Sequence, residues 1–199
     1  MKSLQIDCSF ITATGYANLA AGLRNLEEVI FDYSSSVHPD AATLDDICTF
    51  FETCTQLNCI ELMHLRVTPQ QMQRIVGPHI KSLILSRMLG NYFEDPYDVN
   101  MWKTICESSP NLEVLGVTSD IFYNDMIHIS SIPLLKSHCK NLKEVEFDRC
   151  ADIFTFMALV KELPSLRKAS VSFEHSRPKK TAFVARMKKI NPLLEVHLF

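Results

Sequence analysis

One short apolar phrase recurs along the whole chain, and it limits the fold more than any other feature of the sequence. The phrase is an apolar residue, two variable residues, a second apolar residue, one variable residue and a third apolar residue. The first positions of successive copies lie on average about 27 residues apart, which is typical of stacked repeats with one strand each. The eight copies are Met1-Leu4-Ile6, Leu26-Val29-Phe31, Leu57-Ile60-Leu62, Ile80-Leu83-Leu85, Leu112-Leu115-Val117, Leu142-Val145-Phe147, Leu166-Ala169-Val171 and Leu193-Val196-Leu198.

Each copy predicts a strand that is followed by a helix. The last two apolar positions of the phrase are two residues apart, so in an extended chain both side chains lie on one face. Between copies the apolar spacing becomes helical, as in Leu44, Ile47, Cys48 and Phe51. The segment Thr68-Pro69-Gln70-Gln71 has the composition of a capping box with proline at the first helical position. The sequence therefore predicts an α/β protein.

The repeat also predicts how these units assemble. A single strand and helix cannot bury the apolar strand face, so the units must stack. We expect a single leucine-rich-repeat domain over residues 1–199, a horseshoe-shaped solenoid of about eight repeats. Its parallel strands would line the concave face and its helices the convex face. A doubly wound or flavodoxin-like sheet has the same alternation, but it usually carries a glycine-rich turn after the first strand, and this chain has 5 Gly in all.

One repeat resembles the cysteine-containing class of leucine-rich repeats. In that class a cysteine stands three residues before the first leucine, a second cysteine three residues after the last apolar position, and an isoleucine three residues further. Cys139, Cys150 and Ile153 occupy these positions. The segment Cys54-Thr-Gln-Leu57 repeats the lead-in, and Ser109-Pro-Asn-Leu112 resembles the frequent Cys-Pro-Asn-Leu with serine in place of cysteine. The class is typical of F-box proteins, the substrate-recognition subunits of cullin-based ubiquitin ligases.

The resemblance implies a protein-binding module that selects substrates for ubiquitination, with a cullin ubiquitin ligase complex as a partner. An F-box would form a helical segment ahead of the repeats, whereas a repeat strand begins at Met1 here. The expected role is therefore substrate recognition by an F-box-type adaptor that lacks its F-box. The alternative is an intracellular repeat scaffold or inhibitor unrelated to ubiquitination.

The residues that flank the core pair in each strand should face the open side of the sheet. In the fourth and fifth repeats they are small or apolar, and acidic residues stand on both sides of them. Such a floor suits a protein partner with an apolar anchor and basic flanks. The alternative is that the acids keep an exposed sheet soluble and block pairing with other chains. The expected binding residues are Glu28, Asp32, Glu61, Ile84, Val114, Thr118, Glu144, Glu146, Asp148 and Lys168.

A second candidate binding feature is the long spacing after the fourth strand. It contains Tyr92 and Phe93, followed by Trp102. Exposed aromatic residues on a loop are typical anchors for a partner, although they can equally fold back over the rim of a solenoid. We therefore expect Tyr92 and Phe93 to form a protein-binding loop.

The charge of the chain predicts no attraction to nucleic acid or membranes. The 20 Lys and Arg against 23 Asp and Glu give a formal charge of −3. One segment, from Arg177 to Lys189, has six positive charges and no acid, which could serve nuclear import or nucleic-acid binding. Its one aromatic residue, Phe183, follows the helical spacing of a core position instead of interleaving with the charges for base stacking. We expect a solvated outer helix and no nucleic-acid partner.

Histidine and cysteine spacing predicts neither catalysis nor metal binding. The seven His form no known catalytic or metal motif, and the seven Cys contain no Cys-x-x-Cys pair. His138 and Cys139 are adjacent, but Cys139 occupies a core position of its repeat. We expect a protein without enzymatic activity or cofactor. Asp7 interrupts what would be the apolar stretch of a signal peptide, and no segment has the length of a membrane span, so we expect a cytoplasmic protein, or a nuclear one if the basic segment directs import.

Overall fold

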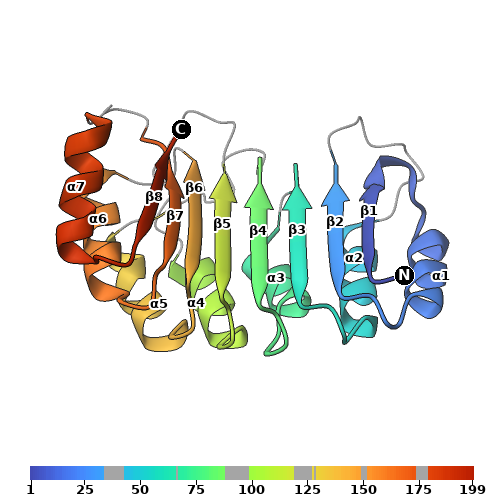
Figure 1. Ribbon diagram of the computed structural model, residues 1–199. Coiled ribbons are helices and arrows are strands. Elements are labelled where there is room, and N and C mark those ends of the chain that lie inside the picture. The colour runs from blue at the N-terminus through green and yellow to red at the C-terminus, as the bar shows by residue number, and fades with distance from the viewer. Residues whose placement is uncertain are drawn as a thin grey trace.

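The protein's structure is a computed structural model that describes residues 1–33, 43–65, 67–87, 99–118, 127, 129–148, 152–173 and 179–199. Within these residues, eight strands form one open sheet in which all neighbours are parallel (Figure 1). The strands are β1 (Ser3–Asp7), β2 (Glu28–Asp32), β3 (Cys59–Met63), β4 (Ser82–Ser86), β5 (Val114–Thr118), β6 (Glu144–Asp148), β7 (Lys168–Val171) and β8 (Glu195–Leu198).

Helices alternate with these strands along the chain. Successive helices pack on one another, and Figure 1 shows them gathered along one side of the sheet. The described helices are α1 (Ala13–Gly22), α2 (Leu44–Thr53), α3 (Pro69–Ile75), α4 (Val99–Ser108), α5 (Ile132–His138), α6 (Ile153–Glu162) and α7 (Lys180–Ile190), with 3-10 turns η1 (Cys8–Phe10) and η2 (Ile129–Ser131). The predicted alternation of strand and helix is confirmed. None of the helices in the described ranges has the length and apolar character needed to span a membrane.

The order of the strands in the sheet is their order in the chain, from β1 to β8. A doubly wound sheet instead has a point where the strand order reverses. No such reversal occurs among the described strands, so the alternative of a doubly wound or flavodoxin-like fold is wrong for this chain.

The core lies between the sheet and the helices. In the inner strands the second and fourth residues are buried, and in register these residues form two continuous rows across the sheet. The last positions of the phrases form one of these rows, because each member pairs with the next in the register Leu62, Leu85, Val117, Phe147 and Val171. In β1 the equivalent residues Leu4 and Ile6 are only half-buried.

A recurring turn leads into the strands. The backbone N–H of the first phrase residue donates to the carbonyl three residues earlier, as from Leu57 to Cys54 (3.1 Å) and from Leu142 to Cys139 (3.1 Å). The last repeat departs from the predicted phrase, since Leu194 makes this bond and is 1% exposed, whereas Leu193 is 66% exposed. In the final repeat, therefore, one residue instead of two separates the turn residue Leu194 from the first buried strand position, Val196.

Side-chain caps start the helices where the sequence predicts them. At α3 the Thr68 hydroxyl accepts from the backbone N–H of Gln71, and the Gln71 side chain accepts from the backbone N–H of Thr68. This reciprocal pair confirms the predicted capping box. Thr43 and Asp46 form the same arrangement at α2. The two caps thus fix the residues at which α2 and α3 begin.

Candidate functional site

The candidate site is the open face, which we define as the side of the sheet formed by the first, third and fifth residues of each strand. These side chains point away from the buried positions because successive residues in a strand face opposite sides. They are half-buried or exposed throughout the described strands, apart from Ser86 and Gly116, which are buried. Whereas the other face of the sheet packs on the core, none of the described helices covers this face (Figure 1).

The ten strand residues predicted to bind a partner all lie on the open face, and the strand register fixes their rows. The row of first residues contains Glu28, Val114, Glu144 and Lys168, and the row of third residues contains Glu61, Ile84 and Glu146. The row of fifth residues contains Asp32, Thr118 and Asp148. Tyr92 and Phe93, the predicted binding loop, lie outside the described residues.

The middle of the open face is apolar and closely packed. Ile84 and Gly116 are direct neighbours in the row of third residues. A Cβ atom on Gly116 would come within 3.0 Å of the Ile84 Cγ2 atom, so glycine allows the isoleucine side chain to cover this part of the sheet. With half-buried Val114 beside Gly116, these residues form a small apolar floor.

Acidic residues border this floor on two sides. In the row of third residues Glu61 precedes Ile84, and Glu146 follows Gly116. The Glu61 carboxylate accepts a hydrogen bond from the Ser86 hydroxyl at 3.0 Å. No described side chain donates a hydrogen bond to Glu146, which is half-buried. Glu61 and Glu146 thus present carboxylates on opposite sides of one apolar surface.

Glu146 differs from an ordinary surface acid in the pKa of its carboxyl. Burial raises the pKa of its carboxyl above the usual range, and the neighbouring Lys168 ammonium opposes that rise. The carboxylates of Glu144, Glu61 and Asp148 add to the raised pKa by repulsion. A cation placed over Glu146 would relieve both the lost hydration and the repulsion.

Two other acids of the open face have partners on the neighbouring repeat. Glu144 forms an ion pair with Lys168 on the next strand. Asp148 accepts a hydrogen bond from the Ser172 hydroxyl. Glu144 therefore contributes less free negative charge than the sequence alone indicates, and Lys168 acts first as its counter-ion.

Sequence reasoning missed the pair formed by His64 and Asp32. The His64 Nδ1 atom lies 3.0 Å from the Asp32 Oδ1 atom at the end of β3, and both side chains are largely shielded from solvent. His64 has a φ of 57°, and Arg87, at the same position after β4, has a φ of 52°. Residues other than glycine adopt this left-handed region at a cost. In the sequence both residues directly follow a strand, and this position alone does not predict a left-handed turn.

Most cysteines of the described ranges are packing residues of the core. Cys8, Cys48, Cys54, Cys106 and Cys139 are buried, and Cys59 is half-buried on the open face. Burial raises the pKa of the Cys8 thiol to about 12 and that of Cys48 to about 11, so both stay protonated near neutral pH. Within the ranges that the structure describes, no three His, Cys, Asp or Glu side chains are grouped so that they could hold a metal ion.

The predicted basic helix is α7. Phe183 and Met187 are buried, as their spacing predicts, and Lys180, Arg186, Lys188 and Lys189 are exposed. The helix begins at Lys180, with Lys179 as its N-cap residue and no side-chain cap. Arg177 lies outside the described residues.

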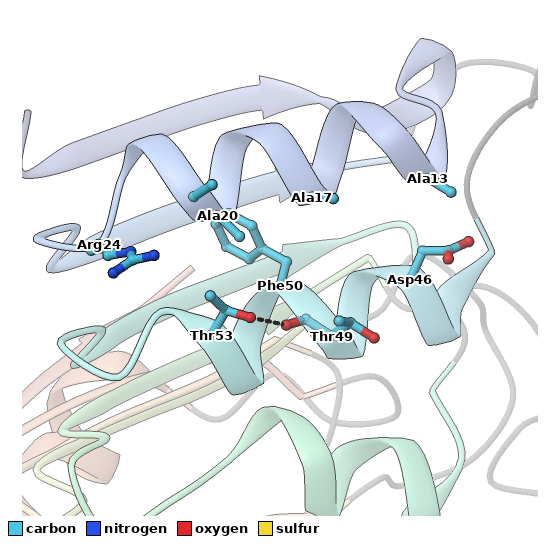
Figure 2. Close-up of a pocket in the computed structure, with 9 residues that line it drawn as sticks. Ala13, Ala17, Ala20, Arg24, Asp46, Thr49, Phe50 and Thr53 are labelled. Atoms are coloured by element: carbon cyan, nitrogen blue, oxygen red, sulfur yellow. Dashed lines mark hydrogen bonds between the residues drawn. The ribbon is translucent and has the colours of Figure 1, made fainter.

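A hollow of about 240 Å³ lies between α1 and α2, away from the open face. Figure 2 shows Ala17 and Ala20 on α1 facing Phe50 and Thr53 on α2. The hollow exists because the α1 residues are alanines, whose side chains are too short to fill the space between the helices. The Thr53 hydroxyl already donates to the Thr49 carbonyl at 2.9 Å, so this hydroxyl does not need a ligand.

Trp102, which the sequence groups with the insertion before it, is a core residue of α4. Its side chain is 1% exposed. It therefore cannot serve as a surface anchor.

A scan against protein-family models found no match, and a search of curated proteins also found none.

Proposed function

We propose that this chain is a leucine-rich-repeat solenoid that binds another protein through its open face. In this proposal the sheet is the concave side of a horseshoe and the helices are its convex side. The recurring phrase, the sequential parallel strands and the repeated turn before the strands support it.

A single observation carries the binding proposal. None of the described helices covers the open face (Figure 1), and that face places an apolar floor between two acidic positions, Glu61 and Glu146. A surface with an apolar centre and a charged rim is typical of a protein-binding site. The partner that fits it has an apolar anchor flanked by basic residues, because like charges would repel an acidic partner.

The finer proposal is that the repeats come from an F-box-type ubiquitin ligase adaptor and select its substrate. Cys54 and Cys139 are both buried at the lead-in position of their repeats, and the serine at the same position, Ser109, is buried as well. This pattern supports the cysteine-containing repeat type. The alternative is a repeat scaffold or inhibitor outside the ubiquitin system. Co-purification of a cullin complex with the captured chain would favour the adaptor, and its absence with a partner present would favour the scaffold.

The binding proposal can be tested by panning a random peptide library against the chain. We expect selection of peptides rich in Lys, Arg and apolar residues. Reversing Glu144, Glu146 and Asp148 together to Lys should abolish that selection, because charges at a surface steer association. It should lower the melting temperature only modestly, since the lost bonds to Lys168 and Ser172 lie at the surface of the sheet.

A matched control reverses three acids on the helical side, Glu52, Glu107 and Glu162, and so changes the net charge equally. This control should select the same peptides as the unaltered chain. Selection that does not depend on the open-face acids would overturn the proposed site.

A further inference from the structure

Resting on the proposed function, the register of the sheet also constrains the spacing of the partner's residues. Glu61, Ile84, Gly116 and Glu146 follow one another on strands β3 to β6 in a single row. Three strand-to-strand steps separate the two glutamates, and each step is about 4.8 Å, so their Cα atoms are about 14 Å apart. The midpoint of this distance lies over Ile84 and Gly116.

An extended peptide matches this distance. Its residues rise about 3.3 Å each, so residues four apart are separated by about 13 Å and point to the same side. The residue halfway between them also points to that side. In a helix, residues four apart are separated by only about 6 Å along the axis, which is too short for this row.

The other two rows fit a short peptide less well. In the row of first residues, Glu28 lies four strands from Glu144, and Glu144 is already paired with Lys168. In the row of fifth residues, Asp32 is paired with His64. Among the acids that lie on either side of β4 and β5 in one row, Glu61 and Glu146 are the closest pair, and the apolar pair lies directly between them.

We propose that the open face binds an extended segment of a partner that crosses the strands and carries the pattern basic, any, apolar, any, basic. The two basic side chains lie over Glu61 and Glu146, and the apolar side chain between them rests on Ile84 and Gly116. The recognised class is therefore an extended peptide with two cations four residues apart.

The test compares two peptides of identical composition by fluorescence polarisation at low salt. The spaced peptide is Gly-Lys-Ser-Leu-Ser-Lys-Gly, and the compressed peptide, Gly-Ser-Lys-Leu-Lys-Ser-Gly, brings the cations two residues apart. We expect the spaced peptide to bind about tenfold more tightly, since the compressed one cannot reach both carboxylates at once. High salt should weaken the binding of both peptides, because exposed ion pairs are screened.

Two substitutions test whether the carboxylates of Glu61 and Glu146 cause the preference for the spaced peptide. Glu61→Gln and Glu146→Gln should each reduce the preference for the spaced peptide to about threefold or less, because only one ion pair remains. The control Glu107→Gln, on the exposed side of α4, should keep the full preference. A cooperative thermal unfolding transition in each variant would show that it is folded.

The outcomes separate this inference from the proposed function. If both peptides bind equally well and the two substitutions weaken both to the same extent, the open face binds basic partners but the spacing rule is wrong. If the preference survives Glu146→Gln, the assignment of the row is wrong. If neither basic peptide binds while panning selects ligands of another chemistry, the proposed basic partner fails together with the rule.

Discussion

At the scale of single residues, Glu146 combines a cost to folding with the role in binding that we propose for it. Its carboxylate loses hydration in the folded protein, which raises its pKa. A carboxyl whose folded pKa exceeds its unfolded value destabilises the fold above that folded pKa, and the cost disappears as the pH falls below the unfolded value. Sites that bind ligands often retain such unfavourable groups.

Replacing Glu146 by Gln should therefore raise the melting temperature slightly near pH 7. The gain should vanish near pH 4, where the carboxyl is protonated in both states. Thermal unfolding of both proteins across this pH range would measure it. A glutamine variant that is less stable than the unaltered chain at pH 7 would show that the carboxylate is stabilised by its surroundings, contrary to this account.

Ser109 and Asn191 occupy the same position in their repeats but differ in bonding. The Ser109 hydroxyl is buried without a hydrogen-bond partner in the described structure. The Asn191 side chain donates to the Leu166 carbonyl at 2.9 Å and accepts from the Leu193 N–H at 3.1 Å. Ser109→Ala should thus stabilise the protein by about 1 kcal/mol, and Asn191→Ala should destabilise it by about 1–3 kcal/mol.

Urea denaturation can compare these two variants directly. Equal losses for both would mean that the Ser109 hydroxyl has a partner after all.

At the scale of elements, strands and some helices follow from local sequence because their causes are local. The alternation in each phrase predicts a strand, and the capping-box pattern at Thr68 predicts where α3 begins. The helix α1 has a cap, since the Thr12 hydroxyl accepts from the Gly15 N–H, but alanines lie on both its buried and exposed sides, so its apolar spacing is lost. The left-handed turns at His64 and Arg87 depend on neighbouring strands, so local sequence does not predict them.

The cap of α3 offers a test at this scale. Thr68→Ala removes the hydroxyl that accepts from the Gln71 N–H, and it should lower the free energy of unfolding by about 1 kcal/mol. Thr68→Ser keeps the hydroxyl and should cost much less. Urea denaturation of the two variants would distinguish the loss of the cap from the loss of the methyl group.

At the scale of the whole molecule, the candidate site was predictable in its membership but not in its pairing. The period of two residues in a strand determines that Glu61, Ile84 and Glu146 share one face. Which acid meets which cation depends on rotamers and on contacts between distant repeats. The pairing of Glu144 with Lys168 and that of His64 with Asp32 are therefore results of the folded structure.

The stacking of the repeats predicts that stability is concentrated in the interior of the sheet. Phe147 has neighbours in register on both sides, Val117 and Val171, and is fully buried, whereas Ile6 pairs with Phe31 on one side and is half-buried. Phe147→Ala leaves a cavity between repeats and should destabilise the fold by about 3–5 kcal/mol. Ile6→Ala removes side-chain atoms that are already partly in water, and it should cost about 1–2 kcal/mol.

Chemical denaturation of the two variants gives both free-energy changes. Hydrogen exchange should show the larger loss of protection in the Phe147 variant, around β5 to β7, because each repeat is supported mainly by its neighbours. Similar costs for the two variants would contradict this dependence on neighbouring repeats.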